Sequence, residues 1–189
     1  MADPAVRRSL YVLFARLLAG APDPSLYERL HNGGLKRLAA AQGVDLTSDL
    51  LDETDAVTAA SELGVEWEHL SETVSLRASD YGGKAGDPVT ALSAFLREHR
   101  LELDKATGLP PDHLAVTLAV MGELAGDADA ALDEEAPVRA RSFFLRHLEP
   151  WSQRALTELA SHAQRRFYRG VAAMLSAFLE TERRSYQSA

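Results

Sequence analysis

The sequence predicts an all-α protein, and both its composition and the spacing of its apolar residues support this class. Of the 189 residues, 31 are Ala and 29 are Leu, whereas 11 are Val and none is Ile. Ala and Leu favour helices, and β-branched residues favour strands. Apolar residues also recur at helical spacing along the chain. We therefore expect a single helical domain over residues 1–189, a bundle of about eight to ten helices.

The N-terminal helix is predicted by an apolar stripe. Arg7 and Arg8 are expected to lie off that stripe, as in an amphipathic core helix. The run that starts at Arg7 superficially resembles a twin-arginine export signal, but Arg16 interrupts its apolar part. No segment approaches the roughly 18 apolar residues of a membrane span, so we expect no stable membrane insertion and a cytoplasmic protein. The stripe consists of Leu10, Leu13, Phe14, Leu17 and Leu18.

A second helix is expected after the turn signal Pro22-Asp23-Pro24-Ser25, with a weak point at Asn32-Gly33-Gly34. Thr47 and Ser48 are candidate caps for the helix that follows. These residues open the acidic part of the chain, which is expected to be helical.

Gly64 is expected to separate two acidic helices, and the second of them carries Trp67 and Leu76. Residues 77–87 then hold three glycines and few large apolar side chains, which predicts a flexible hinge or lid within the domain. Asp87-Pro88 begins the next helix, because Asp87 can cap it and Pro88 needs no N–H in the first turn.

Prolines also mark the later helices. Pro110-Pro111 is expected to begin a deeply packed helix, and Pro137 either opens or kinks the next one. Glu149-Pro150-Trp151 predicts the end of one helix and the start of another. The last helix is expected to close at Arg183-Arg184, where positive charge is favourable. The packed face of the first of these helices consists of Leu114, Leu118, Met121 and Ala125.

Charge is distributed unevenly. The net charge is −8, which disfavours nucleic acid and anionic membranes as partners. Residues 139–189 contain nine Arg and four Glu, whereas residues 45–72 contain nine carboxylates and neither Lys nor Arg. The acidic stretch is either a solvated face paired with the Arg-rich end, or a docking surface for an arginine-bearing peptide.

Signals for catalysis are poor. The absence of Cys excludes disulfides, thiolate metal sites and cysteine nucleophiles. The chain has no phosphate-binding glycine loop, no Gly-x-Ser-x-Gly motif and no His-Glu-x-x-His motif. Its six histidines are far apart, and each is read first as a surface or internally bonded side chain. We therefore expect no catalytic residues, no metal site and no cofactor.

The most pointed local motif is Pro110-Pro111-Asp112-His113, which is expected in the first turn of a helix. Asp112 could cap free N–H groups there, and His113 could bond a backbone carbonyl of the neighbouring loop. A ligand-contacting role for the pair has about equal weight. A catalytic pair would need a nucleophile, and no motif places one beside it.

Three segments together resemble the TorD/DmsD group of molybdoenzyme maturation chaperones. The first begins with the motif of residues 110–113, and the second contains His-Leu-x-x-Trp about 30 residues later. The resemblance is strong over residues 101–182 and weaker upstream, where it includes Glu72. The segments are Pro-Pro-Asp-His-Leu-Ala-Val at 110–116, Phe-Phe-Leu-Arg-His-Leu-Glu-Pro-Trp at 143–151 and Phe-Tyr-Arg at 167–169.

The resemblance implies a TorD-like, all-helical cytoplasmic chaperone. Such a protein holds the twin-arginine leader of a molybdopterin-containing oxidoreductase until cofactor insertion is complete. The family's leader-binding Asp-His pair falls on Asp112 and His113, after Pro110 and Pro111. The Glu often found before these prolines is replaced by Leu109, and Trp151 is expected to pack in the core. Guanine-nucleotide binding is left out, because the chain has no phosphate loop.

The residues independently favour peptide capture. A twin-arginine leader offers two Arg and then an apolar helix, and such a peptide needs carboxylates beside an apolar groove. We expect that groove to be lined by residues 110–124 and nearby acidic helices. The candidate peptide-binding residues are Pro110, Pro111, Asp112, His113, Trp67 and Glu72. An empty groove would also favour a homodimer or a domain swap.

Two other classes remain open. A generic helical adaptor or scaffold without leader binding would have the same composition. A small metal- or nucleotide-dependent enzyme is the third reading, and stoichiometric bound metal or turnover lost on substitution of His113 would support it.

Overall fold

The computed structural model describes residues 4–30, 55–82, 87–102, 108–129 and 135–188. These residues form helices, and their β-type pairing is limited to an isolated bridge between Arg77 and His113. The all-α class is confirmed. None of the described helices combines the length and the apolar character that crossing a membrane requires.

The chain divides into two compact units, each assembled from separate stretches of sequence. The first unit comprises Met1–Ala19, Leu76–Ala155 and Glu182–Ala189. The second comprises Gly20–Ser75 and Leu156–Thr181. The single domain expected over residues 1–189 therefore stays a prediction, and each unit is described by itself.

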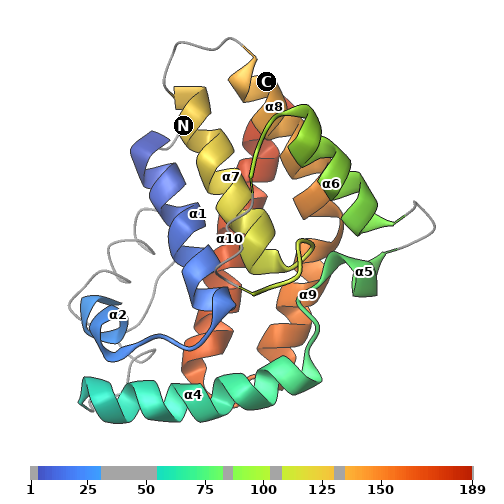
Figure 1. Ribbon diagram of the computed structural model, residues 1–189. Coiled ribbons are helices and arrows are strands. Elements are labelled where there is room, and N and C mark those ends of the chain that lie inside the picture. The colour runs from blue at the N-terminus through green and yellow to red at the C-terminus, as the bar shows by residue number, and fades with distance from the viewer. Residues whose placement is uncertain (1–3, 31–54, 83–86, 103–107, 130–134, 189) are drawn as a thin grey trace. The chain divides into compact units, whose positions relative to one another are not determined.

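The first unit is built around the pairing of helices α1 and α7, which lie side by side (Figure 1). Its elements are α1 (Pro4–Ala19), α5 (Ala78–Tyr81), α6 (Pro88–Glu98), α7 (Leu114–Asp129), α8 (Ala136–Phe143), the π-helix η4 (Phe144–Leu148) and the start of α9 (Glu149–His162). Its most deeply buried side chains include Tyr11, Leu114, Leu118, Phe143 and Phe144.

Two glycines of α7 allow α1 to approach closely. A Cβ at Gly122 would lie 3.2 Å from Val12, and one at Gly126 would lie 3.0 Å from the Arg8 side chain. A side chain at Gly122 would therefore press on Val12 of α1, and one at Gly126 would require the Arg8 side chain to move. The small residues let the two apolar stripes meet.

Arg7, which the sequence predicts to lie off the apolar stripe of α1, is largely buried. Its side chain is 16% exposed, and Nε lies 2.6 Å from the Glu182 carboxylate, which is itself buried. Tyr11 donates to the same carboxylate at 2.7 Å, and Arg7 also hydrogen bonds Tyr186. Burial, followed by the charge of Glu182, raises the pKa of the Tyr11 hydroxyl well above its ordinary value. The end of α10 is thereby fixed to α1.

The second unit contains α2 (Pro24–Arg29), α4 (Ala56–Thr73), the end of α9 and most of α10 (Arg166–Ser188). Asp23 caps α2 and Asp55 caps α4, each through hydrogen bonds from the first-turn N–H groups. Glu66 accepts a hydrogen bond at 2.6 Å from the N–H of Arg165, at the start of α10. Leu70, Tyr168, Val171, Leu175 and Phe178 form the core of this unit.

Several predicted helix boundaries are confirmed. The N-terminal helix is α1, and Asp87 caps α6 through the N–H groups of Val89 and Thr90. Pro137 opens α8 rather than kinking it. One helix ends and another begins at the predicted junction, where η4 is followed by α9 at Glu149.

Other boundaries differ from the prediction. Gly64 does not separate two helices, because α4 runs through it and ends at Thr73, before Leu76. Within the hinge expected over residues 77–87, Ala78–Tyr81 form the helix α5 and residues 83–86 lie outside the described residues, so the hinge itself stays a prediction. The last helix continues past Arg183-Arg184 to Ser188. The weak point at residues 32–34 and the caps Thr47 and Ser48 lie outside the described residues.

Candidate functional site

The Pro110–His113 motif forms a turn ahead of α7, so the prediction that Pro110 and Pro111 begin the helix is wrong. The N–H of His113 donates to the Pro110 carbonyl at 3.0 Å, and α7 begins at Leu114. His113 Nδ1 accepts a hydrogen bond at 3.2 Å from the N–H of Ala115, in the first turn of α7. His113, and not Asp112, therefore caps this helix.

The histidine cap requires a neutral ring, because only an unprotonated nitrogen can accept. His113 is half-buried, and burial lowers its pKa to about 4, with a further lowering by Arg77 and an opposing effect of Asp112. At neutral pH the ring is therefore uncharged, and Nδ1 keeps its lone pair for the Ala115 N–H.

The Asp112 carboxylate hydrogen bonds a neighbouring segment of the chain instead of capping α7. Its carboxylate accepts from the N–H of Ser79 at 3.0 Å and lies 3.3 Å from Nε of Arg77. The Asp112 carbonyl accepts from the N–H of Ala78, and the N–H of Leu114 donates to the Leu76 carbonyl. Residues 76–79 are therefore held against residues 112–114 by main chain and side chain together.

The hydrogen bonds of Asp112 also determine its charge. The side chain is 1% exposed, and burial alone would raise its pKa. The hydrogen bonds from Ser79 and Arg77, together with the positive charge of Arg77, outweigh burial and lower the pKa below its ordinary value. The carboxylate is therefore ionised at neutral pH, and both of its oxygens already have partners within the protein.

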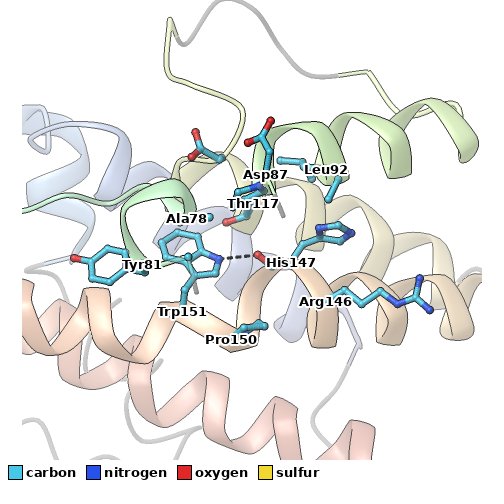
Figure 2. Close-up of a pocket in the computed structure, with 13 residues that line it drawn as sticks. Ala78, Tyr81, Asp87, Leu92, Thr117, Arg146, His147, Pro150 and Trp151 are labelled. Carbon is cyan, nitrogen blue, oxygen red and sulfur yellow. Dashed lines mark hydrogen bonds between the residues drawn. The ribbon is translucent and has the colours of Figure 1, made fainter. Parts of the chain in front are cut away.

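A pocket of about 210 Å³ lies beside this anchored segment in the first unit. Figure 2 shows Tyr81 and Trp151 side by side in its wall, with Asp87 and Leu92 on the side of α6 and Arg146 extending away from the two rings. The lining residues are Ala78, Tyr81, Gly82, Asp87, Pro88, Ala91, Leu92, Asp112, Thr117, Arg146, His147, Pro150 and Trp151.

The aromatic wall depends on an irregular stretch of helix. Pro150 has no backbone N–H, so the ordinary helical hydrogen-bond pattern cannot continue through it, and the π-helix η4 directly precedes α9. The indole of Trp151 donates to the His147 carbonyl at 2.7 Å (Figure 2). The predicted burial of Trp151 is confirmed, since it is 5% exposed. Its ring also stacks on Tyr81, with 6.0 Å between the ring centres.

The polar groups of the pocket differ in their protonation state. The carboxylate of Asp87 keeps a lowered pKa, because it accepts hydrogen bonds from Thr90 and Val89 at the start of α6. His147 has a lowered pKa because of burial and the charge of Arg146. The pocket therefore presents an ionised carboxylate and a neutral imidazole around an aromatic wall.

The predicted binding residues fall in both units. Pro110, Pro111, Asp112 and His113 lie in the first unit, where Asp112 lines the pocket. Trp67 and Glu72 lie on α4 in the second unit. The ring of Trp67 packs against Tyr168 with 5.4 Å between centres, and Glu72 is exposed. A peptide-binding role for these six residues stays a prediction.

The sequence analysis missed the partners that complete the pocket. Tyr81 lay in the stretch predicted as a hinge, and Thr117 was hidden within an apolar helix. An aromatic residue in a Gly-rich stretch was the one available signal for Tyr81. No group of three or more His, Asp or Glu side chains suited to a metal ion occurs within the described residues.

The chain was also compared with known proteins. The profile of the family described as nitrate reductase delta subunit matches residues 39–157, which is more than half of the chain and includes the pocket. No curated protein matched the chain significantly. The family match confirms the resemblance to molybdoenzyme maturation chaperones. The chain belongs to the nitrate reductase delta subunit family, the NarJ/TorD type of molybdoenzyme maturation chaperones.

Proposed function

We propose that this chaperone binds the twin-arginine leader or the apo-form of a molybdopterin oxidoreductase in the cytoplasm, and that it holds this client until cofactor insertion is complete. Family membership supports a maturation role with a molybdoenzyme catalytic subunit as the partner. The chain binds reversibly and catalyses no covalent step. The pocket of the first unit anchors the client.

The size of the pocket carries this assignment. Pockets that enclose drug-sized ligands or cofactors usually measure about 300–1,000 Å³. At about 210 Å³, this pocket is smaller than that range. Its aromatic and aliphatic lining suits an apolar side chain, which is what the helical part of a leader would supply. The size and lining of the pocket therefore support recognition of the client's polypeptide.

The two carboxylates near the pocket have different roles in recognition. Asp87 is exposed and ionised, so it favours the approach of an arginine-bearing peptide. Asp112 is buried and already bonded to Arg77 and Ser79, so it contributes by fixing the wall of the pocket. Substitution of Asp112 would weaken peptide binding indirectly, through displacement of α5.

The proposal is tested by calorimetric titration with a synthetic twin-arginine leader of a molybdopterin oxidoreductase. We expect saturable binding to the wild-type chain, and weaker binding by about tenfold to the Asp112→Ala, His113→Ala double variant, since distorted pockets lose preorganised contacts. Val138→Ala is the control, because Val138 is 66% exposed on α8 and is neither a residue of the pocket lining nor one of the six predicted binding residues. Equal affinity of the double variant would contradict the role of the motif.

A generic helical adaptor is the alternative function. The immobilised chain, exposed to native cytoplasmic extract, should retain a leader-bearing oxidoreductase that mass spectrometry identifies. Retention that persists after deletion of the leader would favour binding to the apo-enzyme body. Failure to retain any such oxidoreductase would favour the adaptor.

A further inference from the structure

Arg154 contacts the aromatic wall of the pocket in two ways. It lies on α9, three residues after Trp151, and its Nη2 donates a hydrogen bond to the Tyr81 carbonyl oxygen. Its guanidinium carbon also lies 5.4 Å from the centre of the Tyr81 ring. The Tyr81 ring therefore contacts two side chains that project from the same stretch of α9, the indole of Trp151 and the guanidinium of Arg154.

We propose that Arg154 is a positioning residue of the peptide pocket. It acts through Tyr81, which it holds against Trp151, and it thereby sets how long a client side chain stays bound. This inference rests on the proposed function. Arg154 itself is absent from the pocket lining, so it affects the client through Tyr81 and not by direct contact.

The need for such a residue follows from the length of α5. This helix has four residues, and a helix of one turn is not stable by its own hydrogen bonds. Asp112 holds its first turn through the N–H of Ser79. Arg154 supplies the matching partner at its other end, where terminal carbonyl groups lack helical donors. The helix α5, which carries Tyr81, is thus held at both of its ends.

Arginine suits this task better than lysine. A planar guanidinium can stack on a ring and donate a directed hydrogen bond at the same time, whereas an ammonium is a compact point charge. Arg154 is otherwise exposed, so its replacement removes these contacts without opening a cavity in the core. The structure therefore permits a test in a folded protein.

The first measurement is the dissociation rate of a synthetic twin-arginine leader peptide from Arg154→Ala, Arg154→Lys and the wild-type chain. We expect Arg154→Ala to bind about tenfold more weakly, mainly through faster dissociation, with Arg154→Lys in between. Loss of a positive charge alone would strengthen the binding of a cationic peptide, so the expected change has the opposite sign to a charge effect. Arg141→Ala, which removes an exposed Arg from α8, is the matched control.

The second measurement needs no peptide. The chain has two Trp, so Trp67→Phe leaves Trp151 as the sole reporter. In that background Arg154→Ala should weaken the near-ultraviolet dichroism of Trp151 and increase its mobility in anisotropy decay, with the helical signal unchanged. Combining Arg154→Ala with Tyr81→Ala should add little to the loss of affinity seen with Tyr81→Ala alone.

The outcomes separate the two proposals. An Arg154→Ala protein with the wild-type Trp151 signal and the wild-type dissociation rate would overturn the positioning role. Additive losses in the Tyr81 cycle would also overturn it. If the wild-type chain binds no leader, the proposed function fails, and the Trp151 signal still decides whether Arg154 holds Tyr81.

Discussion

Asp112 in the first unit and Glu66 in the second are both buried carboxylates, but they are satisfied to different degrees. Asp112 is 1% exposed, and its two oxygens meet the Ser79 N–H and the Arg77 guanidinium. Glu66 is 6% exposed, and one oxygen accepts from the Arg165 N–H. Its other oxygen is buried without a hydrogen-bond partner among the described residues.

The difference teaches what a buried carboxylate needs in order to stabilise a fold. Removing a carboxylate from water is costly, and hydrogen bonds or an opposite charge must offset that cost. Asp112 receives both, and its lowered pKa reflects them. Glu66 receives one donor at the start of α10, while the nearby Arg165 guanidinium pairs with Glu62 at 2.7 Å. The first carboxylate should therefore be hard to replace and the second easy.

Replacement of Asp112 should have the largest effect. Asp112→Ala leaves the N–H of Ser79 without its acceptor and removes the buried partner of Arg77, so we expect the first unit to lose about 2–3 kcal/mol of unfolding free energy. Urea unfolding followed by Trp151 fluorescence in a Trp67→Phe background measures this unit. Glu98→Ala, which removes an exposed carboxylate from α6, should change stability by less than about 0.5 kcal/mol. Equal effects of the two substitutions would contradict the structural role of Asp112.

Acid should weaken the same motif in two separate pH ranges. The pKa of His113 is about 4 in the folded protein and 6.5 in its ordinary state, so the unfolded chain binds more protons between these values. Stability is therefore complete above pH 6.5 and falls as the pH drops toward 4. The stability from Asp112 is lost only at lower pH, as the pH falls through its lowered pKa.

Unfolding free energies measured at several pH values between 7 and 4 test the contribution of His113. His113→Gln should make the slope shallower over this range, and the part that remains should come from His147, whose pKa is also lowered. The control His162→Gln, at an exposed residue, should leave the slope unchanged. A slope as steep in His113→Gln as in the wild-type chain would show that His113 does not contribute.

Local sequence signals predicted the helices whose caps are local. Asp87 and Pro88 begin α6 as expected, because a side chain that bonds N–H groups two and three residues later acts within one segment. The same reasoning failed at Asp112, whose carboxylate bonds Ser79, 33 residues away. The neighbouring His113 caps α7 instead, by accepting a hydrogen bond from the Ala115 N–H. A capping residue is therefore predictable only when no distant donor competes for it.

The pocket required long-range information that spacing does not contain. Tyr81 and Trp151 were both visible in the sequence, but their stacking depends on the pairing of residues 76–79 with residues 112–114. At Gly64 the local signal was misleading, because glycine predicted a helix break that does not occur. Leu63 and Leu70 bury enough apolar surface there for α4 to continue. Tertiary burial outweighed the local helix propensity at that point.

The smallest expected effect is that of Glu66→Gln, and its matched counterpart is Asp112→Asn. Each substitution replaces one carboxylate oxygen by an amide nitrogen without a change of size. In Glu66→Gln the remaining oxygen can still accept from the Arg165 N–H, and the oxygen that the amide nitrogen replaces has no hydrogen-bond partner among the described residues. We expect the free energy of unfolding to change by less than about 0.5 kcal/mol, as measured by Trp67 fluorescence in a Trp151→Phe background.

In Asp112→Asn the new amide donor must face the Ser79 N–H or the Arg77 guanidinium, so this variant should be clearly less stable than its parent. An equal loss in both variants would mean that the second oxygen of Glu66 is hydrogen bonded in solution, and the contrast between the two carboxylates would disappear.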